Sequence, residues 1–235
     1  MKKSTFFSFL SIAVLIPATL YLGTHLKGRW YYLTSTLVIL ESMLPFFLAF
    51  ETRKPQAREL VTIAVMCALA VVSRVAILIP NFKPTTAIIM IAGIALGPEA
   101  GFMTGAVTAF ASNFFFSQGP WTPWQMLGYG VGGFLAGILF STGKLKNNPV
   151  ILALFGFFSI FLIVGPLLDC SSIFMMMSRV TPKYVIAVFS AGLPNNLIHA
   201  AACAVTMLLF SHPLLTKLER LKRKYGMMDV RKADT

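Results

Sequence analysis

The sequence contains little charge, and very little negative charge. Only 12% of its 235 residues are charged, and Asp and Glu together number 8 against 20 Lys and Arg. Residues 100–143 carry no charged side chain at all. Soluble domains carry about 25% charged residues, so the composition excludes an ordinary soluble domain.

Several chemical motifs are also missing. The sequence has no GxxxxGK[ST] loop, which excludes ATP hydrolysis by a P-loop, and no paired Asp motif for metal-dependent group transfer. The three cysteines, Cys67, Cys170 and Cys203, lack the spacing of metal ligands. We therefore expect no disulfide framework and no metal site, and the leading interpretation assigns the chain no catalytic residue and no cofactor.

What the sequence has instead is a succession of apolar runs. Hydrophobic residues make up 57% of the chain, and the mean hydropathy is +0.77. A helix needs about 20 apolar residues to cross a bilayer, and the runs lack the alternation of barrel strands. We therefore predict an all-α integral membrane protein of about eight helices, at 4–23, 31–50, 58–79, 85–97, 100–115, 123–142, 149–168 and 184–210.

Three of these runs have unusual features. Runs 85–97 and 100–115 are short and are separated only by Gly and Pro-containing residues, so we expect a broken or tilted pair there. The first run follows two lysines and imitates a signal peptide, but it is long and lacks a small-x-small cleavage site. We therefore interpret it as a retained span.

The basic residues predict an orientation. If both termini are cytoplasmic, the cytoplasmic segments hold 14 of the 20 Lys and Arg, and the outer segments hold 6. This asymmetry follows the positive-inside rule, so we predict a multi-pass cell-membrane protein with both termini in the cytoplasm and no nucleic-acid partner. Segments 81–84, 112–125 and 169–183 then face outward. The basic stretch 217–224 is expected to form a helix that leaves the membrane near anionic headgroups.

The outward segment 112–125 combines aromatic rings, amides and prolines. Its candidate ligand-binding side chains are Asn113, Phe115, Phe116, Gln118, Trp121, Trp124 and Gln125. The rings offer flat apolar surfaces, the amides both donate and accept hydrogen bonds, and the prolines stiffen the segment, which reduces the entropic cost of binding. An interfacial aromatic belt explains the tryptophans alone but not the interleaved amides. This pattern favours a bulky, mostly uncharged organic ligand.

Polar residues inside the apolar runs form a second group of candidates. Arg74 lies late in the third run, where a charge is either functional or extends to the headgroups, and Asp169 is a possible partner for Arg74 or Arg179. Asn195 and His199 stand four residues apart and share a helix face. They either reach a binding site or form interhelical hydrogen bonds.

Small residues recur at the spacing that lets helices approach closely. Ala64 and Ala68 form an AxxxA pattern, and four GxxxG patterns begin at Gly93, Gly101, Gly128 and Gly133. We expect most of these residues to be packing positions inside the bundle.

From about Glu59 to Phe210 the sequence resembles the substrate-specific (S) components of energy-coupling factor (ECF) transporters. The resemblance rests on the alanine pattern in a helix that ends near Arg74, and on three segments, Asn81–Pro84, Ala92–Phe102 and Ser112–Gln125. It implies a six-helix core at 58–212, followed by a basic cytoplasmic tail at 213–235. Residues 1–57 depart from that pattern and are interpreted as an added transmembrane hairpin of unassigned role.

The resemblance also implies a function. S components capture a vitamin with their outer loops, which would add Asn81 and Phe82 to the ligand-binding residues. They dock through the AxxxA face, here Ala64 and Ala68, on a membrane coupling protein that carries two cytoplasmic ATPases. The stiff, Trp-rich segment without acidic residues resembles the corrinoid-type members most, so cobalamin or a related corrinoid is the first expectation, and riboflavin, a queuosine precursor or pantothenate are alternatives. A membrane enzyme that uses Asp169 and His199 is the alternative from another class.

Overall fold

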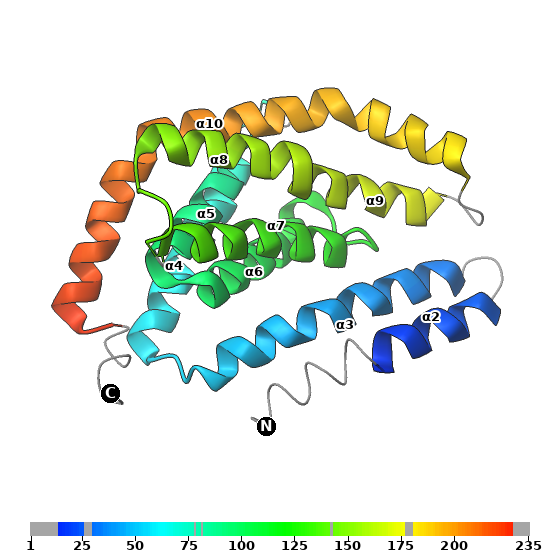
Figure 1. Cartoon of the computed structure of the whole chain (residues 1–235), viewed down its shortest axis with the longest axis horizontal. Helices are drawn as coiled ribbons and strands as arrows, with labels where there is room; N and C mark the ends of the chain where they lie inside the picture. The colour runs from blue at the N-terminus through cyan, green and yellow to red at the C-terminus, as the bar shows by residue number, and fades with distance from the viewer. Residues whose placement is uncertain are drawn as a thin grey trace.

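The computed structural model describes residues 14–25, 30–77, 79–80, 82–141, 143–176 and 181–227. All regular secondary structure within these ranges is helical, which confirms the predicted all-α fold (Figure 1). The helices are α2 (Ile16–His25), α3 (Trp30–Thr52), α4 (Ala57–Ala76), α5 (Thr85–Leu96), α6 (Pro98–Phe116), α7 (Thr122–Ala136, extended by a π-helical turn at Gly137–Ser141), α8 (Pro149–Ser159), α9 (Gly165–Met176, joined to α8 by a π-helical turn at Ile160–Val164) and α10 (Pro182–Tyr225).

Three stretches in the described ranges are long and apolar enough to cross a membrane, namely Ala57–Ala76, Pro149–Ile173 and Pro182–Tyr225. Helix α5 is apolar but only 12 residues long, and every one of its residues is buried. It packs against α4, α6, α7 and α10. Because all of its residues are buried by neighbouring helices, α5 forms the centre of the bundle, and α4, α6, α7 and α10 surround it.

Most helix ends agree with the sequence-based prediction, but two predicted ends are wrong. The helix expected to end at 168 continues through Asp169 to Met176, so segment 169–183 is not one outward loop. The helix expected to end at 210 continues past Pro213 to Tyr225, because a proline can bend a helix without ending it. The predicted boundary at 212/213 therefore falls inside α10. Most of the first predicted helix, 4–23, lies outside the described residues.

Helices α5, α6 and α7 meet backbone to backbone at glycines. A Cβ atom added to Gly101 of α6 would lie 2.6 Å from Cα of Gly93 in α5 and 2.7 Å from the carbonyl carbon of Gly133 in α7. A Cβ atom at Gly105 would lie 2.6 Å from the backbone nitrogen of Gly130. No side chain fits in these spaces, so these glycines are packing positions, as the spacing predicts.

The break between α5 and α6 also depends on glycine. Gly97 has a φ of 96°, a conformation that other residues rarely adopt, and Pro98 begins α6 directly after it. This confirms the predicted break between the two short runs. The break turns the chain so that α6 runs back beside α5.

The hairpin of α2 and α3 lies along one side of the bundle (Figure 1). Phe46 of α3 stacks on Phe102 of α6 with ring centroids 4.1 Å apart, and its edge meets Phe134 of α7 at 4.9 Å. Met43 is buried in the same contact. Within the hairpin, Thr19 Oγ1 donates a hydrogen bond of 2.7 Å to Glu41 Oε1. The hairpin is therefore packed on the core through α3.

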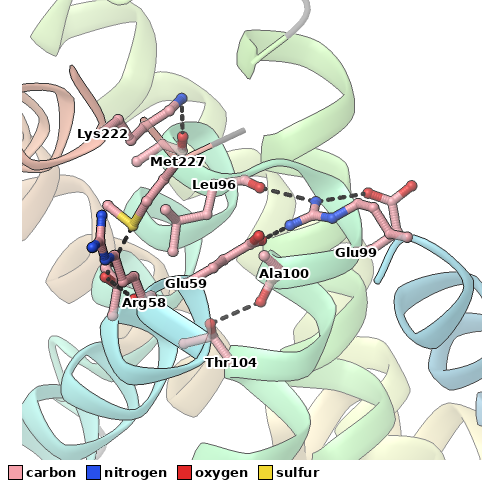
Figure 2. A network of polar contacts seen from close by, with 11 residues as sticks. Arg58, Glu59, Leu96, Glu99, Ala100, Thr104, Lys222 and Met227 are labelled. Atoms are coloured by element: carbon pink, nitrogen blue, oxygen red, sulfur yellow. Dashed lines mark hydrogen bonds and ion pairs between the residues drawn. The ribbon is translucent and has the colours of Figure 1, made fainter. Parts of the chain in front are cut away.

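Polar contacts join the hairpin, the core and the end of α10 at one end of the bundle, which we call the tail end. The guanidinium of Arg53, just after α3, forms ion pairs with Glu59 and Glu99 and donates to the carbonyl of Leu96 at 3.2 Å. Figure 2 shows Glu59, Leu96 and Glu99 meeting there from α4, α5 and α6. Lys222 Nζ of α10 donates to the carbonyl oxygen of Ala95 at 2.6 Å.

The last part of α10 lies across the tail end. The ribbon changes direction between its orange and red portions (Figure 1), and Pro213 lies in this part of the helix. Beyond it, Leu215 and Leu218 are buried in the core, whereas Lys217 and Arg220 are exposed. The basic stretch is helical, as predicted, but one face of it packs on the bundle.

The glycine contact between α6 and α7 gives the first test. Replacement Gly133→Ala should lower the free energy of unfolding by about 1–3 kcal/mol, because its Cβ has no room beside the backbone of Gly101. Gly128→Ala is the control on the same helix, since a Cβ there lies at an ordinary 3.4 Å from Leu168. The midpoint of thermal unfolding in detergent measures both variants, and equal midpoints would contradict the close contact.

Candidate ligand-binding site

Arg74 lies at the end of α4 opposite the tail end, which we call the loop end, and it faces other helices. Its Nη1 donates hydrogen bonds to Ser112 Oγ and, at 3.0 Å, to Asn113 Oδ1, both on α6. Its guanidinium lies 4.8 Å from the ring centroid of Phe116 and 5.8 Å from that of Tyr129. These two hydrogen bonds and two aromatic rings hold the Arg74 side chain against α6 and α7. The side chain therefore does not extend to the lipid headgroups.

Asn113 is the hub of this group. It is buried at the end of α6, and its amide uses both of its ends. Its oxygen accepts from Arg74, and its Nδ2 donates to Thr122 Oγ1 at 3.0 Å and to Gln125 Oε1 at 2.8 Å. The network therefore fixes Arg74 of α4 relative to the start of α7.

Tyr129 connects this group to His199 of α10. The Tyr129 and His199 ring centroids are 6.4 Å apart, and His199 Nε2 lies 3.2 Å from Thr86 Oγ1 of α5. Both rings are buried. Arg74 and His199, which are far apart in the sequence, are thus separated by a single aromatic ring.

The predicted long loop at 112–125 is wrong in extent. Ser112–Phe116 belong to α6 and Thr122 begins α7, so only residues 117–121 are outside helices. Pro123 lies in the first turn of α7, where the backbone N–H that proline lacks has no helical partner. Prolines that we interpreted as stiffening a loop therefore include one that starts a helix.

The short turn is closed by its own side chains. Gln118 Nε2 donates to the carbonyl of Phe110 at 2.9 Å, and its Oε1 accepts from Thr122 Oγ1 at 2.9 Å. Gly119 leaves space for the ring of Trp121, whose atoms would lie 2.5 Å from an added Cβ. Trp124 is 7% exposed and belongs to the interior of the bundle. Gln118 and Trp121 thus shape the turn, whereas Trp124 packs inside the bundle.

Phe115, Asn195 and Phe82 complete the predicted residues that the structure describes. Phe115 is 67% exposed on the outside of α6, and Asn195 is exposed on α10. Phe82 is half-buried, with its backbone N–H donating to the carbonyl of Pro80 at 2.7 Å. Asn81 lies outside the described residues.

Asp169 does not pair with Arg74. Its Oδ2 accepts a 2.7 Å hydrogen bond from Asn196 Nδ2, and Arg179, its other predicted partner, lies outside the described residues. Asn196 fits against Gly165, where an added Cβ would lie 2.6 Å from its side chain. Asp169 and His199 thus have different partners, Asn196 and Thr86. Among the described residues, no group of His, Cys, Asp and Glu is arranged to hold a metal ion.

Three residues of this network, Ser112, Thr122 and Tyr129, were not singled out from the sequence. A signal existed for two of them. Thr122 and Tyr129 are three residues before and four residues after Gln125, so all three share one face of α7.

The alanines of the AxxxA pattern lie on the surface. Ala64 and Ala68 are exposed on α4. Near them, at the tail end, is an apolar groove of about 450 Å³. Its walls include Val61 and Val65 from α4 and Leu221 from α10. This side of α4 therefore offers an apolar surface that has small side chains at Ala64 and Ala68.

The Asn113 hub gives the second test. Replacement Asn113→Leu should lower the free energy of unfolding by about 1–3 kcal/mol, because the buried partners of the amide lose their hydrogen bonds. Asn147→Leu, in an exposed connection, is the matched control and should leave it unchanged. Thermal unfolding in detergent measures both, and an unaltered Asn113→Leu midpoint would show that the network contributes little.

Comparisons with known proteins place this chain in a family. No curated protein and no solved structure matches the chain. A family model described as ECF-type riboflavin transporter, S component, matches residues 54–217, which is more than half of the chain. S components are non-catalytic, substrate-binding transport subunits that work in the membrane with the ECF coupling protein and separate ATPases. The chain therefore belongs to the S components of ECF-type transporters and is a multi-pass, all-α integral membrane protein.

Proposed function

We propose that this S component captures a vitamin-sized ligand at the loop end, beside Arg74. The observation that carries the proposal is the position of Arg74, which is held by Ser112 and Asn113 and flanked by Phe116 and Tyr129. A ring system can pack on the aromatic faces while its polar groups meet the guanidinium. Because α4, α6 and α7 all contribute, a ligand here would contact three helices at once.

A flavin-type compound is the leading candidate for the ligand. The description of the matching family supports it, and the isoalloxazine ring is flat and carries polar edges, as the site requires. The corrinoid expectation depended on a long, stiff, Trp-rich loop, and that loop is a five-residue turn, 117–121, with Trp124 buried. Cobalamin, pantothenate and a queuosine precursor are therefore the second candidates.

We propose that the coupling protein docks on the exposed face of α4. Ala64 and Ala68 would let a partner helix approach closely, and the neighbouring groove between α4 and α10 would receive its larger apolar side chains. The tail end would then face the cytoplasm, where the ATPases act. The count of 14 against 6 basic residues supports this orientation, with both termini cytoplasmic.

The ligand site is tested by binding to the purified full-length chain. Riboflavin fluorescence should be quenched on binding, and Phe116→Ala should weaken the affinity by about tenfold, or about 1.4 kcal/mol, through the loss of an aromatic surface. Phe115→Ala, the adjacent and outward-facing ring, is the matched control. Calorimetry with pantothenate and cobinamide tests the second candidates. If none of the three compounds binds, the proposed ligand class is wrong.

The docking face is tested by separating binding from uptake. The double replacement Ala64→Leu with Ala68→Leu should abolish ligand uptake by cells that contain the coupling protein and ATPases, because the added side chains block close approach. Ligand binding by the purified variant should stay unchanged. Ala187→Leu, exposed on α10, is the control for bulk alone. Loss of binding in the double variant would instead mean that the alanines support the fold.

A further inference from the structure

We propose that Arg74 and Lys83 together bind a carboxylate or phosphate group, so that the ligand of this S component is an anion. The inference rests on the proposed function, because it names the chemical class of the ligand at the same site. It revises the expectation of a mostly uncharged ligand.

The two cations lie beside one aromatic ring. The guanidinium of Arg74 is 4.8 Å from the ring centroid of Phe116, and Nζ of Lys83 is 5.9 Å from the same centroid. Lys83 follows α4 in the chain, and its ammonium donates to the carbonyl oxygen of Ile77 at the end of that helix. Both side chains are half-buried and held by hydrogen bonds, so both positive charges are fixed beside the same ring.

Among the residues that the structure describes, no carboxylate pairs with either of these cations. In the described part of the chain, both ion pairs belong to Arg53 at the tail end, and neither Arg74 nor Lys83 takes part in one. Asp169 is bonded to Asn196, and Glu41 accepts from Thr19 in the hairpin. A bound anion would therefore offset the electrostatic repulsion between the two cations.

The electrostatic environment of Lys83 agrees with this geometry. Burial lowers the pKa of Lys83 below its ordinary value, and the positive charge of Arg74 lowers it further. A bound anion would favour the charged form of the amine and act against both effects.

Arg74 also has donors to spare. A guanidinium has five N–H donors, and the hydrogen bonds to Ser112 and Asn113 both use Nη1. The remaining donors suit a carboxylate or a phosphate, which arginine binds through two parallel hydrogen bonds. Phe116, 44% exposed, offers its ring to an apolar part of the same ligand. The geometry therefore favours a flat or apolar body with an anionic group.

Two matched pairs of compounds test the charge of the ligand directly. Riboflavin and flavin mononucleotide share a ring system but differ by a phosphate, and panthenol and pantothenate differ by a carboxylate. Calorimetry with the purified full-length chain should show that the anionic member of at least one pair binds about tenfold or more tightly than the neutral member. Raising the salt concentration should reduce that preference.

Variants then assign the preference to the two cations. Lys83→Gln and Arg74→Gln should each reduce the preference for the anion about tenfold, and Arg74→Lys should retain part of it. Lys83 lies outside the helices, so its replacement tests the proposal even if Arg74→Gln unfolds. Lys146→Gln, an exposed lysine in the connection between α7 and α8, is the matched control and should leave the preference unchanged.

The outcomes separate this inference from the proposed function. If the neutral compounds bind as tightly as the anions, and Lys83→Gln alters neither, the chain is a binding subunit but the anion site is wrong. If no member of either pair binds, and cobinamide does not bind either, the proposed ligand class fails and the inference that rests on it fails too.

Discussion

The structure depends on the direct contact between the backbones of α5, α6 and α7. Gly93, Gly101 and Gly133 leave no room for a side chain between these helices. Because of this contact, the end of α6 and the start of α7 lie close enough for Asn113 to reach both Thr122 and Gln125. The position of Arg74 follows from that of Asn113. Three glycines near the centre of the bundle thus determine the arrangement of a polar site at its loop end.

The arginines at the two ends of the bundle have different kinds of partner. At the tail end, Arg53 has two carboxylate partners and Lys222 has a backbone carbonyl. These contacts fasten α3 and the last turns of α10 to the ends of α4, α5 and α6. At the loop end, Arg74 is held by neutral groups, Ser112 and Asn113. Neutral partners fix a cation without cancelling its charge, so Arg74 stays available for an interaction with a ligand at the loop end.

The fold could largely be predicted from the sequence because the thickness of a bilayer sets the length of the apolar run that can cross it. The glycine spacing identified the close contacts, and the Gly97–Pro98 pair identified the break between α5 and α6. The ends of the last two helices were harder to predict, since their apolar runs were expected to end at 168 and 210. In the structure Asp169 has Asn196 as a partner inside the bundle, and α10 continues through Pro213. A single sequence does not reveal such partners.

The candidate site was predictable only in part. Arg74 and His199 were identified because polar side chains are unusual in apolar runs, and Asn113 and Gln125 because amides alternate with aromatic rings in segment 112–125. Thr122 was missed because a loop was assigned where α7 begins. Tyr129 was missed because an aromatic residue inside a span is ordinary. Its importance comes from its position between Arg74 and His199, which depends on how three helices cross.

Helices α4 and α10 each reach both ends of the molecule. At the loop half, α4 carries Arg74 and α10 carries His199, and at the tail end the same two helices line the apolar groove. A helix rises about 1.5 Å per residue, so over the 20 residues of α4 a tilt of about 5° moves one end by about 2–3 Å relative to the other. A tilt of α4 that moves Arg74 at the loop end would therefore also change the width of the groove at the tail end.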